Sequence, residues 1–318
     1  MKKRVVAAIG VFDGVHLGHR TLLSETVRRA RALHAEPVAV TFDRHPMSLV
    51  SAHTAPPGLM PRHLSVEKLK RSGMKRVIIL PFTKKLARTP AEEFVQRFLV
   101  GRLGVTEVVA GRDFRVGRGG RGNTALLRRL GVILGFGVRI VPPAHAGASA
   151  VSSTLIRKLI QRGDVIRASR MLGHAHLIEG RVVHGRKLAR KLGFPTINIR
   201  PTGGLLPPNG VYAVLLGPGR IPGVANLGLR PTVEKHAHSP LLEVHCLVRP
   251  PIGGRDLAHS GRTRPPRVVP GRLVLAEVLA YLRPERKFAD LTRLTRAVQG
   301  DISRARKILR RPPPHPFL

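Results

Sequence analysis

Two histidines near the start of the chain, His16 and His19, have a type and spacing that suit phosphate chemistry. They follow an apolar run at residues 5–9 that is broken by Gly10, and a helical pattern begins after them. A buried strand that ends in glycines beside a helix N-terminus presents backbone N–H groups and the positive end of the helix dipole. Imidazoles three positions apart can lie on one side of that helix and donate to phosphate oxygens. The segment therefore predicts a nucleotide-binding site.

Three other interpretations of this segment are a zinc site, a P-loop and a simple turn. Zinc metalloproteases space their histidines four apart with a glutamate between them, and no acidic residue lies between His16 and His19. No Gly-Lys-Ser or Gly-Lys-Thr follows a glycine loop, and GxGxxG does not follow this strand. A tight turn with two exposed histidines stays open as the alternative to nucleotide binding.

The segment at 10–19, GVFDGVHLGH, resembles the nucleotide-binding signature of the bifunctional riboflavin kinase and FAD synthetase family. The resemblance continues in the same order through VTFDRHP at 40–46, LPFTKKLARTPAEEF at 80–94, GRDFRVG at 111–117 and SSTLIR at 152–157. In the second half it covers HGRKLARKLGFPTIN at 184–198, GVYA at 210–213, GVANLGLRPTV at 223–233, LEVH at 242–245 and LRPERKF at 282–288. These collinear matches extend from Gly10 to about Arg306. They imply an enzyme that uses ATP to convert riboflavin to FMN and FMN to FAD.

Length and composition are compatible with a two-domain enzyme. The chain has 318 residues, of which 42% are hydrophobic, so each of two domains can bury a core. One cysteine, Cys246, excludes an internal disulfide, which is typical of a reducing compartment. No segment approaches the roughly eighteen apolar residues needed to span a membrane. We therefore expect a cytoplasmic protein.

The chain is strongly basic. It has 56 Lys and Arg against 18 Asp and Glu, a formal net charge of +38. Such a charge attracts nucleic acid as well as nucleotides, and we expect non-specific RNA binding at low salt. Aromatic residues make up only 4%, tryptophan is absent, and no stacking platform for bases is visible. We therefore attribute the charge chiefly to compositional bias and keep RNA association as a secondary expectation.

The first half alternates strand-like and helical patterns, which is typical of a parallel sheet covered by helices. Strands are expected at 5–9, 37–42, 76–80, 106–110 and 137–141, and helices around 20–33, 65–71 and 90–102. Thr89-Pro90-Ala91-Glu92 predicts a capping box with proline at the first helical position. Ser152 or Ser153 is expected to cap a helix that continues through Ile160 and is ended by Gly163. We expect a Rossmann-like α/β FMN adenylyltransferase domain at 1–174.

The second half changes to short runs separated by glycine and proline turns, which predicts a small antiparallel β-barrel. The runs lie at 177–183, 196–199, 210–216, 222–227, 241–248 and 271–279. A last helical pattern covers 291–309 and is stopped by Arg311-Pro312-Pro313-Pro314. We expect a riboflavin kinase domain at 175–309 and a disordered tail at 310–318. The connection at 249–270 is basic and longer than the resemblance implies.

For the first domain, the resemblance implies adenylyl transfer from ATP to FMN, with release of pyrophosphate. This reaction depends mainly on positioning and charge stabilisation, so donors such as His16 and His19 would be the catalytic groups. The implied ATP site comprises Gly10, Phe12, Asp13, Gly14, His16, Gly18, His19, Ser153, Thr154 and Arg157. The implied FMN site comprises Asp43, His45, Pro46, Asp113, Phe114 and Arg115. On the residues alone, Ser153 could be a simple helix cap and Arg157 a solvated helix charge.

For the second domain, the resemblance implies transfer of the γ-phosphoryl group of ATP to the 5′-hydroxyl of riboflavin. An alcohol needs a general base, and Glu243 is the candidate. Strand alternation places Glu243 and His245 on the face opposite Val244 and Cys246. The implied ATP site comprises Gly185, Arg190, Gly193, Pro195, Thr196 and Asn198. Thr196 and Asn198 offer hard oxygen ligands for Mg²⁺, while an ordinary polar strand residue is the plainer interpretation of Glu243.

Departures from the family pattern fall mostly in this second half. Ala189 stands where a glycine usually precedes the loop arginine, and its Cβ would resist a positive φ. Ile197 replaces a usual alanine, and the acidic and aromatic residues that normally follow LEVH are absent. One alternative is therefore an FMN adenylyltransferase with a flavin-binding but kinase-inactive second domain. A second is a basic RNA-associated protein without catalysis.

Overall fold

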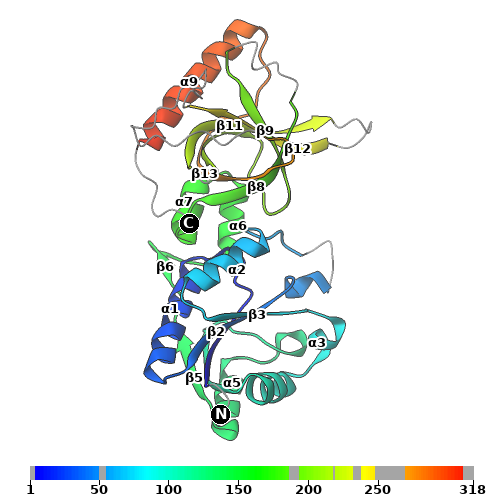
Figure 1. Ribbon diagram of the computed structural model, residues 1–318, viewed down its shortest axis with the longest axis vertical. Coiled ribbons are helices and arrows are strands. Elements are labelled where there is room, and N and C mark those ends of the chain that lie inside the picture. The colour runs from blue at the N-terminus through cyan, green and yellow to red at the C-terminus, as the bar shows by residue number, and fades with distance from the viewer. Residues whose placement is uncertain are drawn as a thin grey trace. The chain divides into compact units, whose positions relative to one another are not determined.

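The structure is a computed structural model that describes residues 4–49, 55–185, 193–217, 219–231, 238–247 and 269–310 (Figure 1). The contacts within the chain divide it into two compact units. Unit 1 comprises Met1–Gly58 and Arg62–Ser153, and unit 2 comprises Leu59–Pro61 and Thr154–Leu318. The domain boundary expected after residue 174 lies beyond this division and stays a prediction.

Unit 1 contains a five-stranded sheet in which every neighbouring pair of strands is parallel, in the order β3-β2-β1-β4-β5. The strands are β1 (Val5–Ile9), β2 (Glu36–Phe42), β3 (Arg76–Leu80), β4 (Val105–Gly111) and β5 (Gly137–Val141). All five strands expected from the sequence are present, and the α/β class of this half is confirmed. The central strand β1 is apolar and buried throughout, as a strand covered on both faces requires.

The helices of unit 1 include three that the sequence predicted and others that it did not. They are α1 (Leu17–Ala32), α2 (Arg62–Arg71), α3 (Lys84–Arg88), α4 (Ala91–Glu93) and α5 (Thr124–Leu134), with a π-helix η3 (Phe94–Arg102) continuing α4. Shorter pieces are η1 (Asp13–Val15), η2 (Pro46–Leu49), η4 (Arg118–Gly120), β6 (His145–Ala146) and β7 (Ser149–Ala150). The unpredicted α5 had a readable signal, because Asn123 caps its start and Gly135, at φ 73°, ends it.

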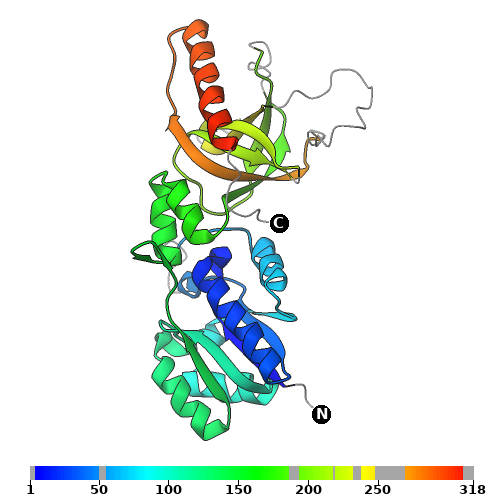
Figure 2. The same ribbon diagram turned by 90° about the vertical axis from the view of Figure 1, so that its left-hand side faces the viewer.

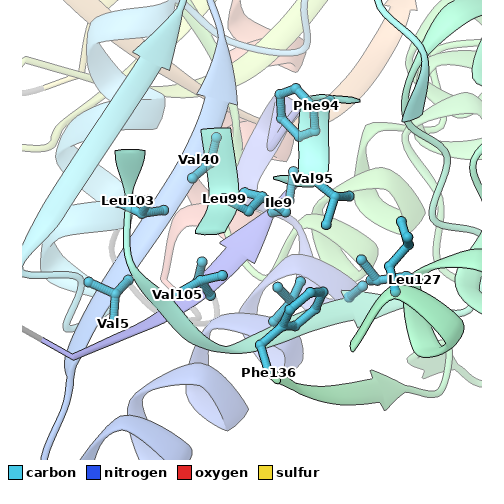
Figure 3. Close-up of a cluster of buried hydrophobic side chains, with 14 of the residues drawn as sticks. Val5, Ile9, Val40, Phe94, Val95, Leu99, Leu103, Val105, Leu127 and Phe136 are labelled. Atoms are coloured by element: carbon cyan, nitrogen blue, oxygen red, sulfur yellow. The ribbon is translucent and has the colours of Figure 1, made fainter. Parts of the chain in front are cut away.

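The two faces of the sheet are buried in separate clusters. Val5 and Ile9 point to the face that packs against η3 and α5, through Phe94, Leu99 and Leu127 (Figure 3). The alternate residues of β1 point to the other face, which packs against α1. This second cluster includes Val6, Ala8, Leu22, Leu23 and Ala30. The sheet is therefore a rigid, two-sided support for the loops at its ends.

The capping box predicted at Thr89 is wrong. Thr89 ends α3, and its hydroxyl donates to the carbonyl oxygen of Lys85 at 2.9 Å. Pro90 is the N-cap of α4 instead of its first helical residue, and no side chain caps this end. The Thr89 hydroxyl is hydrogen-bonded within the preceding helix α3, so it does not cap α4. The local sequence pattern did not indicate this contact.

Unit 2 begins with two short helices. The predicted helix is α6 (Ser153–Gln161), whose first residue is assigned to unit 1 by contacts, and Gly163 at φ +79° follows it as expected. The second, α7 (Val165–Leu172), was not predicted. Asp164 accepts a hydrogen bond from the N–H of Arg167 and so caps α7, and Gly173 ends it at φ 73°.

The rest of unit 2 is a closed antiparallel barrel in the order β10-β11-β12-β9-β8-β13. Its strands are β8 (His176–Val183), β9 (Thr196–Pro201), β10 (Gly210–Leu216), β11 (Ile221–Pro231), β12 (His238–Cys246) and β13 (Leu273–Pro284). Each corresponds to one of the six predicted runs, so the predicted barrel is confirmed. Residues 249–268 of the long connection and the tail at 311–318 lie outside the described residues.

The last helix, α9 (Leu291–Leu309), lies along the outer face of the barrel (Figure 2). It packs Ala305 and Ile302 against Val211, Ala213 and Val224 of β10 and β11. The barrel interior is filled by the alternate residues of the same strands, including Tyr212, Val214, Ala225 and Leu227. Part of the outer face is thus covered by α9, and the rest carries the polar residues described next.

Candidate active sites

The loops that carry the predicted nucleotide and FMN residues meet at one edge of the parallel sheet. Residues 10–19 follow β1, residues 43–46 follow β2 and residues 113–115 follow β4. All three segments leave the carboxyl ends of parallel strands. The strand order also places the topological switch point between β1 and β4, where open α/β sheets bind their ligands. The topology therefore brings the predicted residues of three loops to one ligand-binding edge.

The turn after β1 is held in an unusual backbone conformation. Phe12 has φ 50° and Val15 has φ 39°, both in the left-handed region, and Gly14 between them has φ 77°. Left-handed backbone costs side-chain-bearing residues about 1–2 kcal/mol each. Both side chains are buried, Phe12 at 1% and Val15 at 0% exposure, and this burial offsets the cost. Strain retained in this way is typical of ligand-binding turns.

His16 and His19 form a stacked pair at the start of α1. Their ring centroids are 3.7 Å apart at an interplanar angle of 16°. His16 is the N-cap, and its Nδ1 accepts a hydrogen bond from the backbone N–H of His19 at 3.3 Å. Because Nδ1 accepts this bond, it carries no proton in this arrangement.

His19 is neutral near pH 7. Burial and the neighbouring His16 ring hold the pKa of His19 well below its ordinary value. Its Nδ1 atom is buried and has no hydrogen-bond partner among the described residues. The Phe12 and His19 rings pack in a T-shaped arrangement, with centroids 5.3 Å apart. The exposed-histidine interpretation does not hold, since His16 is buried and His19 is half-buried.

Gly18 and Ser153 support this pair from two directions. A Cβ at Gly18 would lie 3.2 Å from the His16 ring, so a larger residue would displace the cap. Ser153 is the first residue of α6 instead of its cap, and its hydroxyl donates to the carbonyl oxygen of Asp13 at 3.3 Å. Farther along α6, Arg157 is buried at 8% exposure, so it is not a solvated helix charge. Thr154 follows Ser153 on the same helix.

Two of the predicted FMN residues already use side-chain atoms in hydrogen bonds within the chain. Asp43 accepts a hydrogen bond from the N–H of Phe82 at 2.7 Å, and this bond, together with Arg44, lowers the pKa of its carboxyl group. The Asp43 carboxylate thereby joins the loops after β2 and β3. Two residues farther along, His45 Nδ1 accepts a hydrogen bond from the backbone N–H of Met47 at 3.2 Å. Pro46 is the first residue of η2.

The loop after β4 presents polar groups around a buried anchor. Asp113 and Arg115 are exposed, whereas Phe114 is 8% exposed and belongs to the sheet core. The guanidinium of Arg115 donates to the carbonyl oxygen of Phe114 at 3.1 Å. The phenyl ring therefore fixes the loop, and the two charged side chains on either side of it face solvent.

In unit 2, the candidate kinase residues form a row across the outer face of the barrel. Adjacent strands pair Asn198 with Glu243 and Glu243 with Asn226. Leu242 and Val244 point into the barrel, so the alternate residue Glu243 points outward, as predicted. Opposite residues on adjacent strands have Cβ atoms about 5 Å apart. Three polar side chains from β9, β12 and β11 are thus direct neighbours.

Thr196 and His245 form a second outward pair beside this row. His245 Nδ1 lies 3.0 Å from the carbonyl oxygen of Pro195, and the ring contacts Phe194 edge-on with centroids 5.6 Å apart. These contacts fix the entry of β9, which follows Gly193 at φ +83°. Arg190 and Ala189 lie outside the described residues.

Gly185 lies directly against the side chain of Asn198. A Cβ at Gly185 would fall 2.0 Å from Asn198 Nδ2, a separation that no side chain can adopt. The amide nitrogen of Asn198 therefore faces the Gly185 backbone. A carboxamide and the Thr196 hydroxyl are hard oxygen donors of the kind that Mg²⁺ uses together with substrate phosphates. Within the described residues no cluster of three or more His, Cys, Asp or Glu could hold a metal by itself.

Sequence reasoning missed two polar residues beside the row. Asn226 points outward on β11 and donates from Nδ2 to Glu285 Oε1 at 3.2 Å. Alternation along β11 could have found Asn226, because Ala225 and Leu227 on either side are core residues. No local pattern identifies Glu285, which follows the end of β13 and reaches Asn226 only through the closure of the barrel.

Comparison with known proteins gives matches to both units. A family model described as FAD synthetase matches residues 1–155, and one described as riboflavin kinase matches residues 172–309. A bifunctional riboflavin kinase/FMN adenylyltransferase of Escherichia coli is 34% identical over 305 residues, covering 95% of this chain and 92% of that protein. The protein of the same description from Pseudomonas fluorescens is 37% identical over 308 residues, covering 95% and 92%.

A solved structure has a similar fold. It is titled as a macrolide-efflux protein from Streptococcus pneumoniae, with a TM-score of 0.80 and 25% identity, covering 96% of this chain and 95% of that chain. Among the helices that the structure describes here, none is both long enough and apolar enough to cross a bilayer.

Proposed function

This chain belongs to the bifunctional riboflavin kinase/FMN adenylyltransferase family, and from that premise we propose which residues carry out each of its two reactions. The enzyme phosphorylates riboflavin to FMN with ATP and adenylylates FMN to FAD with release of pyrophosphate. The alternatives of a kinase-inactive second domain and of a non-catalytic RNA-associated protein are not favoured.

We propose that His16 and His19 bind the ATP phosphates during adenylyl transfer. A phosphate oxygen of FMN attacks the α-phosphorus of ATP, and the bond to the bridging oxygen of the leaving pyrophosphate breaks. Negative charge grows on the phosphate oxygens, and N–H donors that are already in place stabilise it without reorganisation. The stacking of the two rings at the N-terminus of α1, where the helix dipole also favours anions, supports this role.

The remaining adenylyltransferase residues are proposed by position. Gly10, Phe12, Asp13, Gly14 and Gly18 would shape the backbone cradle. Ser153, Thr154 and Arg157 on α6 would add a hydroxyl pair and a forked cationic donor for phosphate oxygens. The loops after β2 and β4 would receive FMN through Asp43, His45, Pro46, Asp113, Phe114 and Arg115.

We propose Glu243 as the general base for riboflavin phosphorylation. Its carboxylate would accept the proton of the 5′-hydroxyl while that oxygen attacks the γ-phosphorus, and ADP would leave. The observation that carries this proposal is the row of Asn198, Glu243 and Asn226 on adjacent strands. Asn198 and Thr196 would hold Mg²⁺, which supplies neutralisation of the charge on the ATP phosphates. Gly185, Arg190, Gly193 and Pro195 would form the loop over those phosphates.

Two broader expectations stay proposals. The single cysteine supports a cytoplasmic location, and the net charge of +38 supports non-specific RNA association. Both depend on composition alone.

A product assay tests the overall proposal. Purified protein would be incubated with ATP and Mg²⁺ and either riboflavin or FMN, at salt high enough to displace RNA, and the flavins separated by chromatography. FMN and then FAD from riboflavin are expected. FAD from FMN without FMN from riboflavin would show that the second site has no kinase activity. An absence of product from either substrate would overturn both assignments.

A further inference from the structure

Asn226 lies between two carboxylates on the outer face of the barrel. Glu243 is its direct partner on β12, and Glu285 accepts a hydrogen bond from its Nδ2 at 3.2 Å. Glu285 belongs to the segment that follows β13, and β13 pairs with β10 on the other side of β11. The Asn226 amide is therefore approached by one carboxylate from each side of its strand.

Glu285 is fixed in this place by close packing. A Cβ at Gly228 would lie 2.6 Å from Glu285 Oε1, so the carboxylate occupies space that only glycine leaves open. Gly228 is two residues along β11 from Asn226 and points to the same outer face. On β10, the residue opposite Asn226 is Val211, which is buried under α9, so the row of polar residues ends there. Apolar packing and the Gly228 contact thus hold both members of the Asn226–Glu285 pair.

From this arrangement we propose that Asn226, oriented by Glu285, is a positioning residue for Glu243 in riboflavin phosphorylation. This inference rests on the proposed role of Glu243 as the base. One amide N–H of Asn226 is donated to Glu285, which leaves a second N–H and the carbonyl oxygen for groups on the β12 side. A base held in a single orientation by its neighbours gains in rate because no rotamer search precedes proton transfer.

A neutral amide at this position also separates two like charges. Without Asn226, no side chain of β11 would lie between Glu243 and Glu285. The charged or titratable groups on the same outer face include His245 on β12 and Arg200 on β9, and Arg283 and Arg286 lie on the segment of Glu285. Arg283 is already paired with Asp301 of α9 at 2.8 Å. Arg286 lies over the Phe288 ring, 4.9 Å from its centroid.

The decisive experiment measures the kinase kcat and the KM for ATP of Asn226→Asp and Asn226→Ala in the full-length enzyme. Asn226→Ala should lower kcat by about tenfold or more, a part of the 10²–10⁴ that a general base contributes, and change the KM for ATP little. Asn226→Asp keeps the size of the side chain but loses its amide N–H donors, so it should lower kcat to a similar extent. An unchanged kcat, or a kcat that falls only together with a raised KM or with a less stable barrel, would indicate a merely structural role and would overturn the proposal.

Variants of Glu285 test the second half of the pair. Glu285→Gln keeps the shape and one acceptor oxygen, so it should retain most kinase activity, whereas Glu285→Ala should lower kcat as Asn226→Ala does. FAD formation from FMN, measured on the same samples, reports whether unit 1 is active, and denaturant unfolding of those samples reports whether the barrel is folded. If Glu243→Gln removes kinase activity while the Asn226 and Glu285 variants do not, only this inference fails. If Glu243→Gln keeps activity, the proposed base is wrong.

Discussion

We propose that the two reactions use different kinds of side chain, because their nucleophiles differ. A phosphate of FMN is already ionised, so the first site needs donors for developing charge, and neutral imidazoles suffice. The riboflavin hydroxyl carries a proton that must be removed, so the second site needs a carboxylate. His16 and His19 on one side, and Glu243 on the other, match these demands.

We predict that His19→Ala abolishes FAD formation and spares FMN formation. The variant removes one of the two N–H donors at the start of α1 and leaves the barrel untouched. The measurement is the rate of FAD release from FMN and of FMN release from riboflavin, with the unaltered chain alongside. Equal loss of both rates would show that the two sites are not separable as proposed.

Glu243→Gln is the reciprocal change. Glutamine keeps the size of the side chain but cannot accept the hydroxyl proton as a base, so FMN formation should fall by about 10²-fold or more. FAD formation from FMN should be unchanged, which makes this variant the matched control for His19→Ala. Retained kinase activity would mean that the base lies elsewhere.

At the scale of elements, glycines determine how closely backbone segments approach the functional side chains. Gly18 leaves room for the His16 ring, Gly185 for the Asn198 amide and Gly228 for the Glu285 carboxylate. In each case a Cβ would lie 3.2 Å or less from a polar side chain of the site. The elements thus position the sites by close contact as well as by orientation.

We predict that Gly185→Ala impairs the kinase and spares the adenylyltransferase. The new Cβ would displace the Asn198 amide that we propose as a Mg²⁺ ligand, so the KM for Mg-ATP should rise in the kinase assay. Gly300→Ala is the control, because Gly300 lies within α9 with nothing within 4 Å of its added Cβ. That control should leave activity unchanged and stabilise the fold by about 0.5–1 kcal/mol. An unchanged KM in Gly185→Ala would argue against Asn198 as a ligand.

The first barrel strand contains a buried histidine with a consequence for stability. His176 Nε2 lies 2.9 Å from the carbonyl oxygen of Leu205, so Nε2 carries the proton and Nδ1 is buried without a partner among the described residues. Burial lowers the pKa of His176 from 6.5 to about 4. The unfolded chain therefore binds a proton below about pH 6.5 that the folded chain resists until about pH 4.

We predict that acid destabilises the barrel through His176. Between pH 6.5 and about 4, this group should remove about 3 kcal/mol from the free energy of unfolding, since each pKa unit corresponds to about 1.4 kcal/mol. Denaturant unfolding across this range measures the effect. His176→Gln keeps a side-chain N–H donor for the Leu205 oxygen and does not titrate, so its stability should depend less on pH. An identical pH dependence in the two proteins would contradict the assignment.

Much of the architecture was predictable, because strand existence depends on local apolar patterning. All five sheet strands and all six barrel strands were identified from short runs such as residues 5–9 and 210–216. The errors occurred where neighbouring elements compete or contacts are non-local. Thr89 serves the helix before it, and Glu285 meets Asn226 only when the barrel closes. A single sequence contains no local signal for either contact.

At the scale of the whole molecule, charge should affect association more than catalysis. A net charge of +38 attracts polyanions through counterion release, so RNA affinity should fall steeply with salt. We predict that a labelled single-stranded RNA binds at low salt and dissociates near physiological salt, as measured by fluorescence anisotropy. Binding that persists at high salt would indicate a specific site and would give the charge a functional role.

The closure of the barrel also orders the events of synthesis. The first barrel strand, β8, pairs with the last, β13, through residues such as His176 and Val278. A ribosome must therefore release the chain beyond Pro284 before β9, β11 and β12 can be held in their final geometry. The parallel sheet, by contrast, has all its strands once Val141 has emerged. A nascent chain would thus assemble its adenylyltransferase sheet while its kinase barrel is still open. A chain truncated within β13 should accordingly lose kinase activity and keep the parallel sheet of the adenylyltransferase.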